Sequence, residues 1–128
     1  MPPPPTPPTP RFAFRIITRE ELAAFEETGV YPGSALDARD NYMHLSPLEV
    51  VGDTANLYFA GHAALSVLQV ELALIPGAVI RQDWVESRGV FFPHVISGDL
   101  GFAIPRSAVV KIHAMERGAD GAFAPLAL

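Results

Sequence analysis

The sequence of 128 residues contains no cysteine and a single lysine, Lys111. Without cysteine the chain cannot form disulfides, zinc–thiolate sites or cysteine nucleophiles. Schiff-base chemistry would have to use Lys111, because a Schiff base forms on a lysine amine. The G-x-S-x-G elbow, the P-loop and the G-x-G-x-x-G fingerprint are also missing. The sequence therefore does not indicate a serine hydrolase of that class or any of these nucleotide-binding loops.

Long apolar runs are missing too, since none approaches the ~18–20 residues of a membrane span. The start of the chain does not combine basic residues with an apolar core, as a signal peptide does, so we expect a cytoplasmic protein with no membrane partner. The formal net charge of −5 argues against general nucleic-acid binding. It is compatible with one nucleotide-like small molecule as the ligand.

Residues 1–10 are nearly all proline, with two threonines. Because proline cannot form a helix or a central strand, we expect an extended, mobile tail. This tail is either a PxxP ligand or a disordered leader. The rest of the chain has an ordinary globular composition, and we expect residues 11–128 to form a single domain.

This remaining sequence predicts an α+β fold, with two helices near the N-terminus and several strands after them. A capping box of Thr18 and Glu21 begins the first helix, and Gly29 ends it. The second helix is expected over residues 47–59. Residues 104–105 are expected to form a turn. The predicted strands cover residues 12–17, 65–72, 78–84, 90–95 and 108–115.

The densest polar stretch covers residues 37–49. We expect residues 37–41 to form a loop and residues 42–45 to form a short strand, with Tyr42 and His44 on one face. Ser46 and Glu49 have the spacing of a capping box for the second helix. His44 should then lie beside the free N–H groups of a helix N-terminus, where anions bind readily.

Two groups of residues could carry chemistry. His44 and Ser46 could reach one ligand together; alternatively, Ser46 only caps the helix and His44 is a half-buried histidine with satisfied hydrogen bonds. In the second group Glu86 could act as a base, Arg88 could pair with a phosphate, and His94 could carry a proton near pH 7. The alternative for this group is a solvated turn with an internal Glu86–Arg88 pair.

A metal site built from His44, Glu86 and His94 is chemically conceivable. The sequence lacks closely spaced ligand pairs such as H-x-x-x-H, so we predict no metal. Phe91, Phe92 and Phe102 are candidates for either the core or an interface between subunits.

With these residues in view, the chain resembles an uncharacterised bacterial family, domain of unknown function 952. The family pattern has a Gly-x-aromatic turn, an acidic loop ending in Phe-Ile-His-Leu-Ser, a Trp-Glu segment and a Phe-Pro-His segment. Order and spacing fit over residues 12–125. The chain departs from the pattern in the first strand, where Arg15-Ile16 stands in a stretch that often holds a histidine. The matching residues are Gly29-Val30-Tyr31, Asp37 with Asp40, Tyr42-Met43-His44-Leu45-Ser46, Trp84 with Glu86, Ser87-Arg88-Gly89 and Phe92-Pro93-His94-Val95.

That family in turn resembles the ADP-ribosyltransferase fold, and within it the RNA 2′-phosphotransferase branch. Met43-His44-Leu45-Ser46 is similar to the Val-His-Leu-Ser of that branch. The resemblance implies two small, packed, mainly antiparallel sheets flanked by two N-terminal helices. It also implies a cleft that takes NAD as a substrate, with no cofactor held covalently.

From the residues and the resemblance together we expect NAD-dependent ADP-ribosyl transfer or NAD cleavage. Glu86 would be the catalytic carboxylate that stabilises an oxocarbenium-like ribosyl centre, with His44 and His94 as further catalytic residues. The alternative is a non-catalytic module of the same fold that binds a nucleotide or ADP-ribose, which the missing first-strand histidine favours. The residues expected to hold NAD are Tyr42, His44, Ser46 and Arg88.

Overall fold

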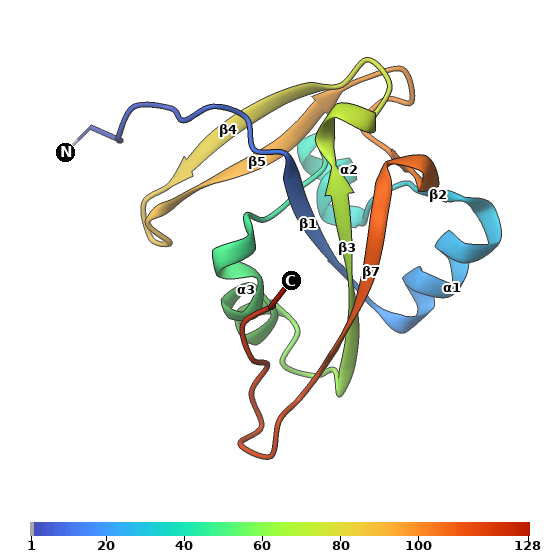
Figure 1. Cartoon of the computed structure of the whole chain (residues 1–128), viewed down its shortest axis with the longest axis vertical. Helices are drawn as coiled ribbons and strands as arrows, with labels where there is room; N and C mark the ends of the chain where they lie inside the picture. The colour runs from blue at the N-terminus through green and yellow to red at the C-terminus, as the bar shows by residue number, and fades with distance from the viewer. Residues whose placement is uncertain (1) are drawn as a thin grey trace.

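A three-stranded antiparallel sheet in the order β1–β3–β7 lies at the centre of the protein, which a computed structural model describes over residues 2–128 (Figure 1). Two further antiparallel pairs, β2–β6 and β4–β5, lie beside it. The β4–β5 pair is a long hairpin at the upper left of Figure 1. The strands are β1 (Phe12–Ile17), β2 (Val30–Tyr31), β3 (Ala64–Glu71), β4 (Val79–Val85), β5 (Val90–Ser97), β6 (Ile104–Pro105) and β7 (Val109–Glu116).

Short helices connect these strands. The first begins at the predicted capping box, because Thr18 Oγ1 accepts the N–H of Glu21 and the Glu21 carboxylate accepts the N–H of Thr18. It ends at Gly29, whose φ of 75° suits glycine. The α-helices are α1 (Arg19–Thr28), α2 (Ala35–Asp40) and α3 (Val51–Tyr58), and the 3-10 helices are η1 (Leu48–Val50), η2 (Leu72–Leu74) and η3 (Arg106–Ala108).

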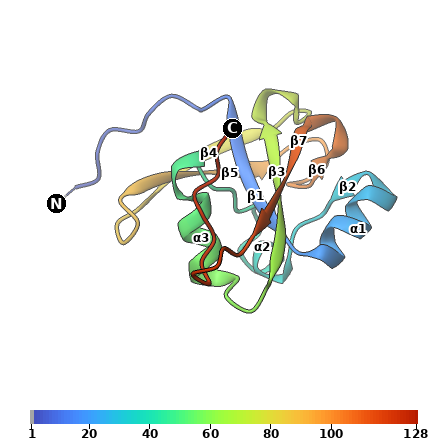
Figure 2. The same ribbon diagram turned by 60° about the horizontal axis from the view of Figure 1, so that its bottom comes forward.

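Both faces of the central sheet are buried. On one face Ala13 and Ile17 of β1 belong to the same hydrophobic cluster as Phe25 of α1. On the other face Phe14 of β1 clusters with Val51 of α3. Alternate β1 residues point to opposite faces, as the two-residue period of a strand requires. Figure 2 shows the C-terminal segment running over α3, which completes this second layer.

The predicted mixture of helices and antiparallel sheets is therefore confirmed. The predicted strands are present with slightly shifted ends. The turn expected at residues 104–105 is wrong, because Ile104 and Pro105 form β6 and pair with Tyr31 and Val30 of β2. Sequence pattern could not reveal this pair, since two residues are too short to show a strand period.

The loop expected over residues 37–41 is also wrong, because α2 covers most of it. Ser34 precedes this helix, and the carboxylate of Asp37 accepts hydrogen bonds from the N–H and the hydroxyl of Ser34 at 2.6 and 3.0 Å. The helix ends at Asn41 in a left-handed conformation (φ 60°), which asparagine tolerates. The start signal was thus Ser34 with Asp37, three residues apart.

The strand expected over residues 42–45 is replaced by an extended segment with isolated bridges, in which Met43 pairs with Val95 and Ser46 with Phe14. The capping box of Ser46 is wrong as well. Both backbone polar groups of Ser46 bond Phe14, at 2.8 and 2.9 Å, and η1 begins after Pro47 without a side-chain cap. This pairing with β1 holds Ser46 as a strand residue, so its hydroxyl does not cap the helix.

The proline tail contains no helix or strand over residues 2–10. It is extended and runs above the β4–β5 hairpin in Figure 1. The carbonyl of Pro8 accepts a hydrogen bond from the side chain of Gln82 in β4 at 3.1 Å. No helix within residues 2–128 is long and apolar enough to cross a membrane.

Candidate functional site

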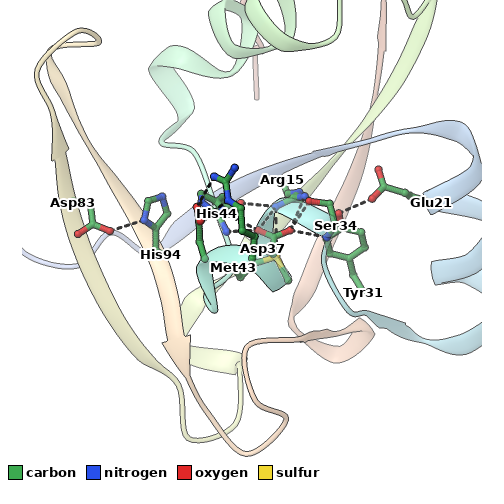
Figure 3. Close-up of polar contacts among 11 residues, drawn as sticks. Arg15, Glu21, Tyr31, Ser34, Asp37, Met43, His44, Asp83 and His94 are labelled. Carbon is green, nitrogen blue, oxygen red and sulfur yellow. Dashed lines mark hydrogen bonds and ion pairs between the residues drawn. The ribbon is translucent and has the colours of Figure 1, made fainter.

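Asp37 of α2 is the centre of a network of polar side chains (Figure 3). Its side chain is fully buried. Arg15 of β1 faces it with two nitrogens, Nη1 at 3.0 Å from Oδ1 and Nη2 at 2.9 Å from Oδ2. This two-pronged geometry is the strongest form of an arginine–carboxylate pair. Arg15 also donates to the carbonyl of His44 at 2.9 Å, so β1 and α2 position the histidine together.

His44 lies between two carboxylates. Its backbone N–H and Nδ1 lie 2.8 and 2.7 Å from Asp37 Oδ1, and its Nε2 lies 2.9 Å from Asp40 Oδ2. Carboxylates only accept hydrogen bonds, so both ring contacts are made only when the ring carries both protons. The side chain is 24% exposed. His44 is therefore held in place with its ring edges already occupied.

Behind Arg15 the network reaches α1, where the hydroxyl of Tyr31 donates to Glu21 at 2.7 Å. The guanidinium of Arg15 lies 5.1 Å from the centre of the Tyr31 ring. Burial raises the pKa of Tyr31 well above its usual range, against the opposing charge of Arg15. Tyr31 therefore stays a neutral donor, which fixes one side of the arginine.

The second histidine, His94 of β5, forms a pair with Asp83 of β4. Nδ1 of His94 lies 2.6 Å from Asp83 Oδ2, and the His94 side chain is 7% exposed. Its Nε2 has no hydrogen-bond partner among residues 2–128. Over the same residues no fully buried side-chain nitrogen or oxygen lacks a partner, so Nε2 must reach the surface. A carboxylate that holds one imidazole nitrogen while the other stays free is the arrangement of a general base.

Tyr42 joins the two histidines. Its ring centre lies 4.4 Å from that of His44 and 4.8 Å from that of His94, and the two histidine rings are 5.3 Å apart. Arg81 of β4 lies 5.0 Å from the centre of the Tyr42 ring and forms an ion pair with Asp83 at 2.7 Å. The segment that follows α2 and the β4–β5 hairpin therefore meet at one cluster of aromatic and charged groups.

The protonation of this cluster follows from its surroundings. Burial lowers the pKa of His94 below its usual 6.5; the charges of His44 and Arg81 act in the same direction, and Asp83 opposes them. Burial alone would raise the pKa of Asp83, but hydrogen bonds from Arg81 and His94 bring it below its usual value. At neutral pH, Asp83 is therefore ionised and His94 is neutral, with its proton on Nδ1 and a free electron pair on Nε2.

The structure unites part of the predicted site. Tyr42, His44 and His94 come together, although they lie on segments about fifty residues apart in the chain. Glu86 is exposed at the turn of the hairpin, where it accepts a hydrogen bond from the Trp84 indole at 2.6 Å. Strand alternation places Trp84 on the face opposite Asp83, so Glu86 is not beside the histidines.

Arg88 contacts another part of the fold, and Ser46 is paired with β1. Arg88 donates to the Thr54 hydroxyl of α3 at 2.7 Å and stacks over the Phe92 ring at 5.2 Å, so the internal Glu86–Arg88 pair that was the alternative for this group does not form. Ser46 lies on the segment of His44, but its backbone is engaged with β1. Of the aromatic candidates, Phe92 is buried and Phe91 is half-buried against Trp84.

Sequence reasoning missed Asp83, Arg81 and Arg15 as site residues. A signal for Asp83 was available in the hairpin, because a turn at residues 86–89 pairs Arg81 with His94 and puts Asp83 on the same face. No comparable signal linked Arg15 to Asp37, since that contact joins a strand to a helix that was not predicted. Among residues 2–128, no group of three or more histidine, aspartate and glutamate side chains is arranged to hold a metal ion.

The fold and the motifs also occur in known proteins. The family model described as "Protein of unknown function (DUF952)" matches residues 16–112. The crystal structure of protein CC0527 from Caulobacter crescentus is 29% identical, with 88% of this chain and 93% of that chain covered and a TM-score of 0.74. The solution NMR structure of CC0527 is 31% identical, with coverage of 88% and 90% and a TM-score of 0.65. No curated protein matches the chain. Because the family model spans most of the sequence, the chain belongs to the DUF952 family.

Proposed function

We propose that the protein binds NAD and breaks the bond between its nicotinamide and its ribose, with His94 as the general base. The observation that carries the proposal is the Asp83–His94 pair, in which Asp83 holds Nδ1 of a histidine ring that lies beside Tyr42. The resemblance of residues 43–46 to the ADP-ribosyltransferase fold supports NAD as the substrate. The acceptor is water or the hydroxyl of a small molecule.

In this reaction the bond between ribose C1′ and the nicotinamide nitrogen breaks, and its electron pair leaves with nicotinamide. The attacking water forms the new C1′–O bond and gives its proton to Nε2 of His94. The products are nicotinamide, ADP-ribose and one proton, so atoms and charge balance. Asp83 keeps His94 in the required tautomer and stabilises the imidazolium that forms.

The charge that develops on the ribose is positive, and carboxylates stabilise it. Asp40 and Asp83 supply this charge in place of Glu86, because their side chains are 27% and 29% exposed beside Tyr42. The Tyr42 ring offers a flat surface for the nicotinamide, which is itself an aromatic cation. His44 is assigned a positioning role, since both of its ring nitrogens already face carboxylates.

The test is incubation of the full chain with millimolar NAD, with nicotinamide release followed by chromatography and NAD binding by calorimetry. His94→Gln should reduce nicotinamide release by about a hundredfold to ten-thousandfold, which is what a general base contributes, while NAD still binds. His62→Gln is the matched control: it makes the same change at a histidine that packs against Phe59. If the wild-type protein gives no heat of binding with NAD and releases no nicotinamide, the proposal is refuted.

The second candidate function is a module that binds a nucleotide or ADP-ribose without catalysis. It is favoured by the occupied ring edges of His44 and by the distance of Glu86 from the histidines in the fold. In that case calorimetry gives binding of ADP-ribose, nicotinamide release equals that without protein, and His94→Gln changes affinity alone. Loss of nicotinamide release in Glu86→Gln would instead restore Glu86 as the catalytic carboxylate.

A further inference from the structure

We infer that the outer face of the β4–β5 hairpin is a binding site for an extended proline-rich segment, and that residues 2–10 of the same chain occupy it. The two faces of the hairpin differ in character. Asp83 and His94 lie on the inner face, and Trp84, Phe91 and Gln82 lie on the outer face. The inference rests on the outer face and is independent of the proposed reaction.

The outer face has the chemistry that recognises polyproline. Trp84 and Phe91 are paired across the two strands with their ring centres 5.1 Å apart. Flat aromatic side chains of this kind form the grooves in which proline-rich ligands dock. Proline rings pack on aromatic surfaces, and the exposed carbonyls of the extended chain accept hydrogen bonds from polar side chains at the rim. Gln82 is such a donor, at 3.1 Å from the carbonyl of Pro8.

The spacing of the tail prolines fits this face. A polyproline II helix has about three residues per turn, so residues three apart form one row. The groove of about 500 Å³ above the outer face is lined by two rows of the tail, and the row of Thr6 and Thr9 is not part of the lining. Threonine, the only polar residue type of the tail, therefore lies outside the two rows that line the groove. The lining prolines are Pro4, Pro7 and Pro10 in one row and Pro5 and Pro8 in the other.

The tail is a suitable occupant because little entropy is lost when it docks. Proline has its φ angle fixed, and a residue before proline is restricted to extended conformations, so the free tail already resembles the bound one. The tail is also joined directly to β1, and Pro10, two residues before that strand, lines the groove. This tether raises the effective concentration of the tail far above that of a separate peptide.

The position of the tail gives it an influence on the site. It lies on one face of the strands whose opposite face carries Asp83 and His94. The hairpin is joined to the segment of His44 by the bridge from Met43 to Val95. A docked tail adds contacts on the outer face and restrains the strands that hold the Asp83–His94 pair.

Trp84 is the only tryptophan, so its fluorescence reports on the groove without a label. The full chain should be compared with a variant in which Pro4, Pro5, Pro7 and Pro8 are changed to serine. In the serine variant the tail should leave the groove, which should shift Trp84 emission to longer wavelength and increase the quenching of this emission by acrylamide. The matched control is Thr6→Ala with Thr9→Ala, which changes the same tail in the row outside the groove and should leave both readings as in the wild type.

A synthetic peptide, PPPPTPPTP, should reverse the shift when it is added to the serine variant. Gln82→Ala in that variant should weaken the affinity for the peptide by about twofold to tenfold, which is the usual effect of losing one neutral hydrogen bond. Identical emission and quenching in the serine variant and the wild type would overturn the inference, provided circular dichroism shows both folded. A dimer by light scattering that disappears in the serine variant would overturn the assignment to the same chain and indicate exchange of tails between copies.

Discussion

Replacing Asp37 by asparagine tests whether this carboxylate holds the site together. The substitution keeps the shape of the side chain and removes its charge. Oδ1 accepts from Arg15, from the N–H of His44 and from its Nδ1, while Oδ2 accepts from Arg15 and from the N–H and hydroxyl of Ser34. Whichever oxygen becomes an amide nitrogen, three donors lose their acceptor.

The expected loss is large because the partner is buried too. The Arg15 side chain is only 12% exposed, and Asp37 is fully buried. Removing one member of a buried ion pair costs about 3–5 kcal/mol, because the other charge remains without its partner. This is a large share of the ~5–15 kcal/mol that stabilises an ordinary domain. It corresponds to a fall in melting temperature of roughly 10–20 °C.

The assay is urea denaturation followed by circular dichroism, with Asp53→Asn, a change at an exposed residue of α3, as the matched control. Arg15→Met combined with Asp37→Asn should cost less than the two single changes added together, because the pair is then removed as a unit. An Asp37→Asn midpoint equal to that of Asp53→Asn would refute the reasoning, since no buried charge would then have lost its partner.

Acid denaturation provides an independent reading. Burial alone would raise the pKa of Asp37, but Arg15 and the N–H groups of Ser34 and His44 outweigh it and hold the pKa well below its usual 3.8. A carboxylate whose folded pKa is depressed contributes stability above its unfolded pKa and loses it as the pH falls below that value. The wild type should therefore lose stability below about pH 4, and Asp37→Asn should lose less over the same range.

Three further outcomes are expected. The NMR titration of His94 should give a pKa below 6.5, and Asp83→Asn should lower this pKa further, because Asp83 opposes the effect of burial. A pKa above 6.5 would contradict the assignment of a neutral imidazole to His94. Because the pKa of folded His94 is lowered, its contribution to stability is complete above pH 6.5 and declines as the pH falls. Thr18→Ala should cost about 1 kcal/mol in urea denaturation through loss of the helix cap, and an unchanged midpoint would argue against it. Gly77→Ala should reduce the free energy of unfolding by about 1–3 kcal/mol, because φ is 66° and the new methyl group meets the Asp99 carboxylate. Urea denaturation of the variant and the wild type measures this cost, and equal midpoints would contradict the prediction.

The elements that could be predicted from sequence are those with local causes. The cap of Thr18 and Glu21 lies within four residues, and the hydrophobic alternation of β1 needs no partner to be recognised. Ser34 and Asp37 carry the same kind of local signal, and α2 was missed because the acidic residues of that stretch were interpreted as a loop.

The site itself depends on contacts between distant segments. Arg15 reaches Asp37 across 22 positions, and no periodicity encodes such a pair. Asp83 and His94 were within reach of prediction through the register of the hairpin. Glu86 lies in the turn beyond the end of β4, where it is held by the indole of Trp84. The residue types indicated which side chains could carry chemistry, and the strand pairing decided which of these side chains lie together.

The distance between the two site histidines is set by backbone contacts. The segment of His44 is attached to β5 by the bridge of Met43 and Val95, whose two hydrogen bonds are 2.9 and 3.2 Å, and to β1 by the bridge of Ser46. His94 precedes Val95 directly, so this bridge holds His94 close to His44. Loosening the hairpin would therefore separate the two histidines before it disturbed either histidine's own carboxylate. The joining of the segment after α2 to the hairpin, more than any single side chain, brings the residues of the candidate site together.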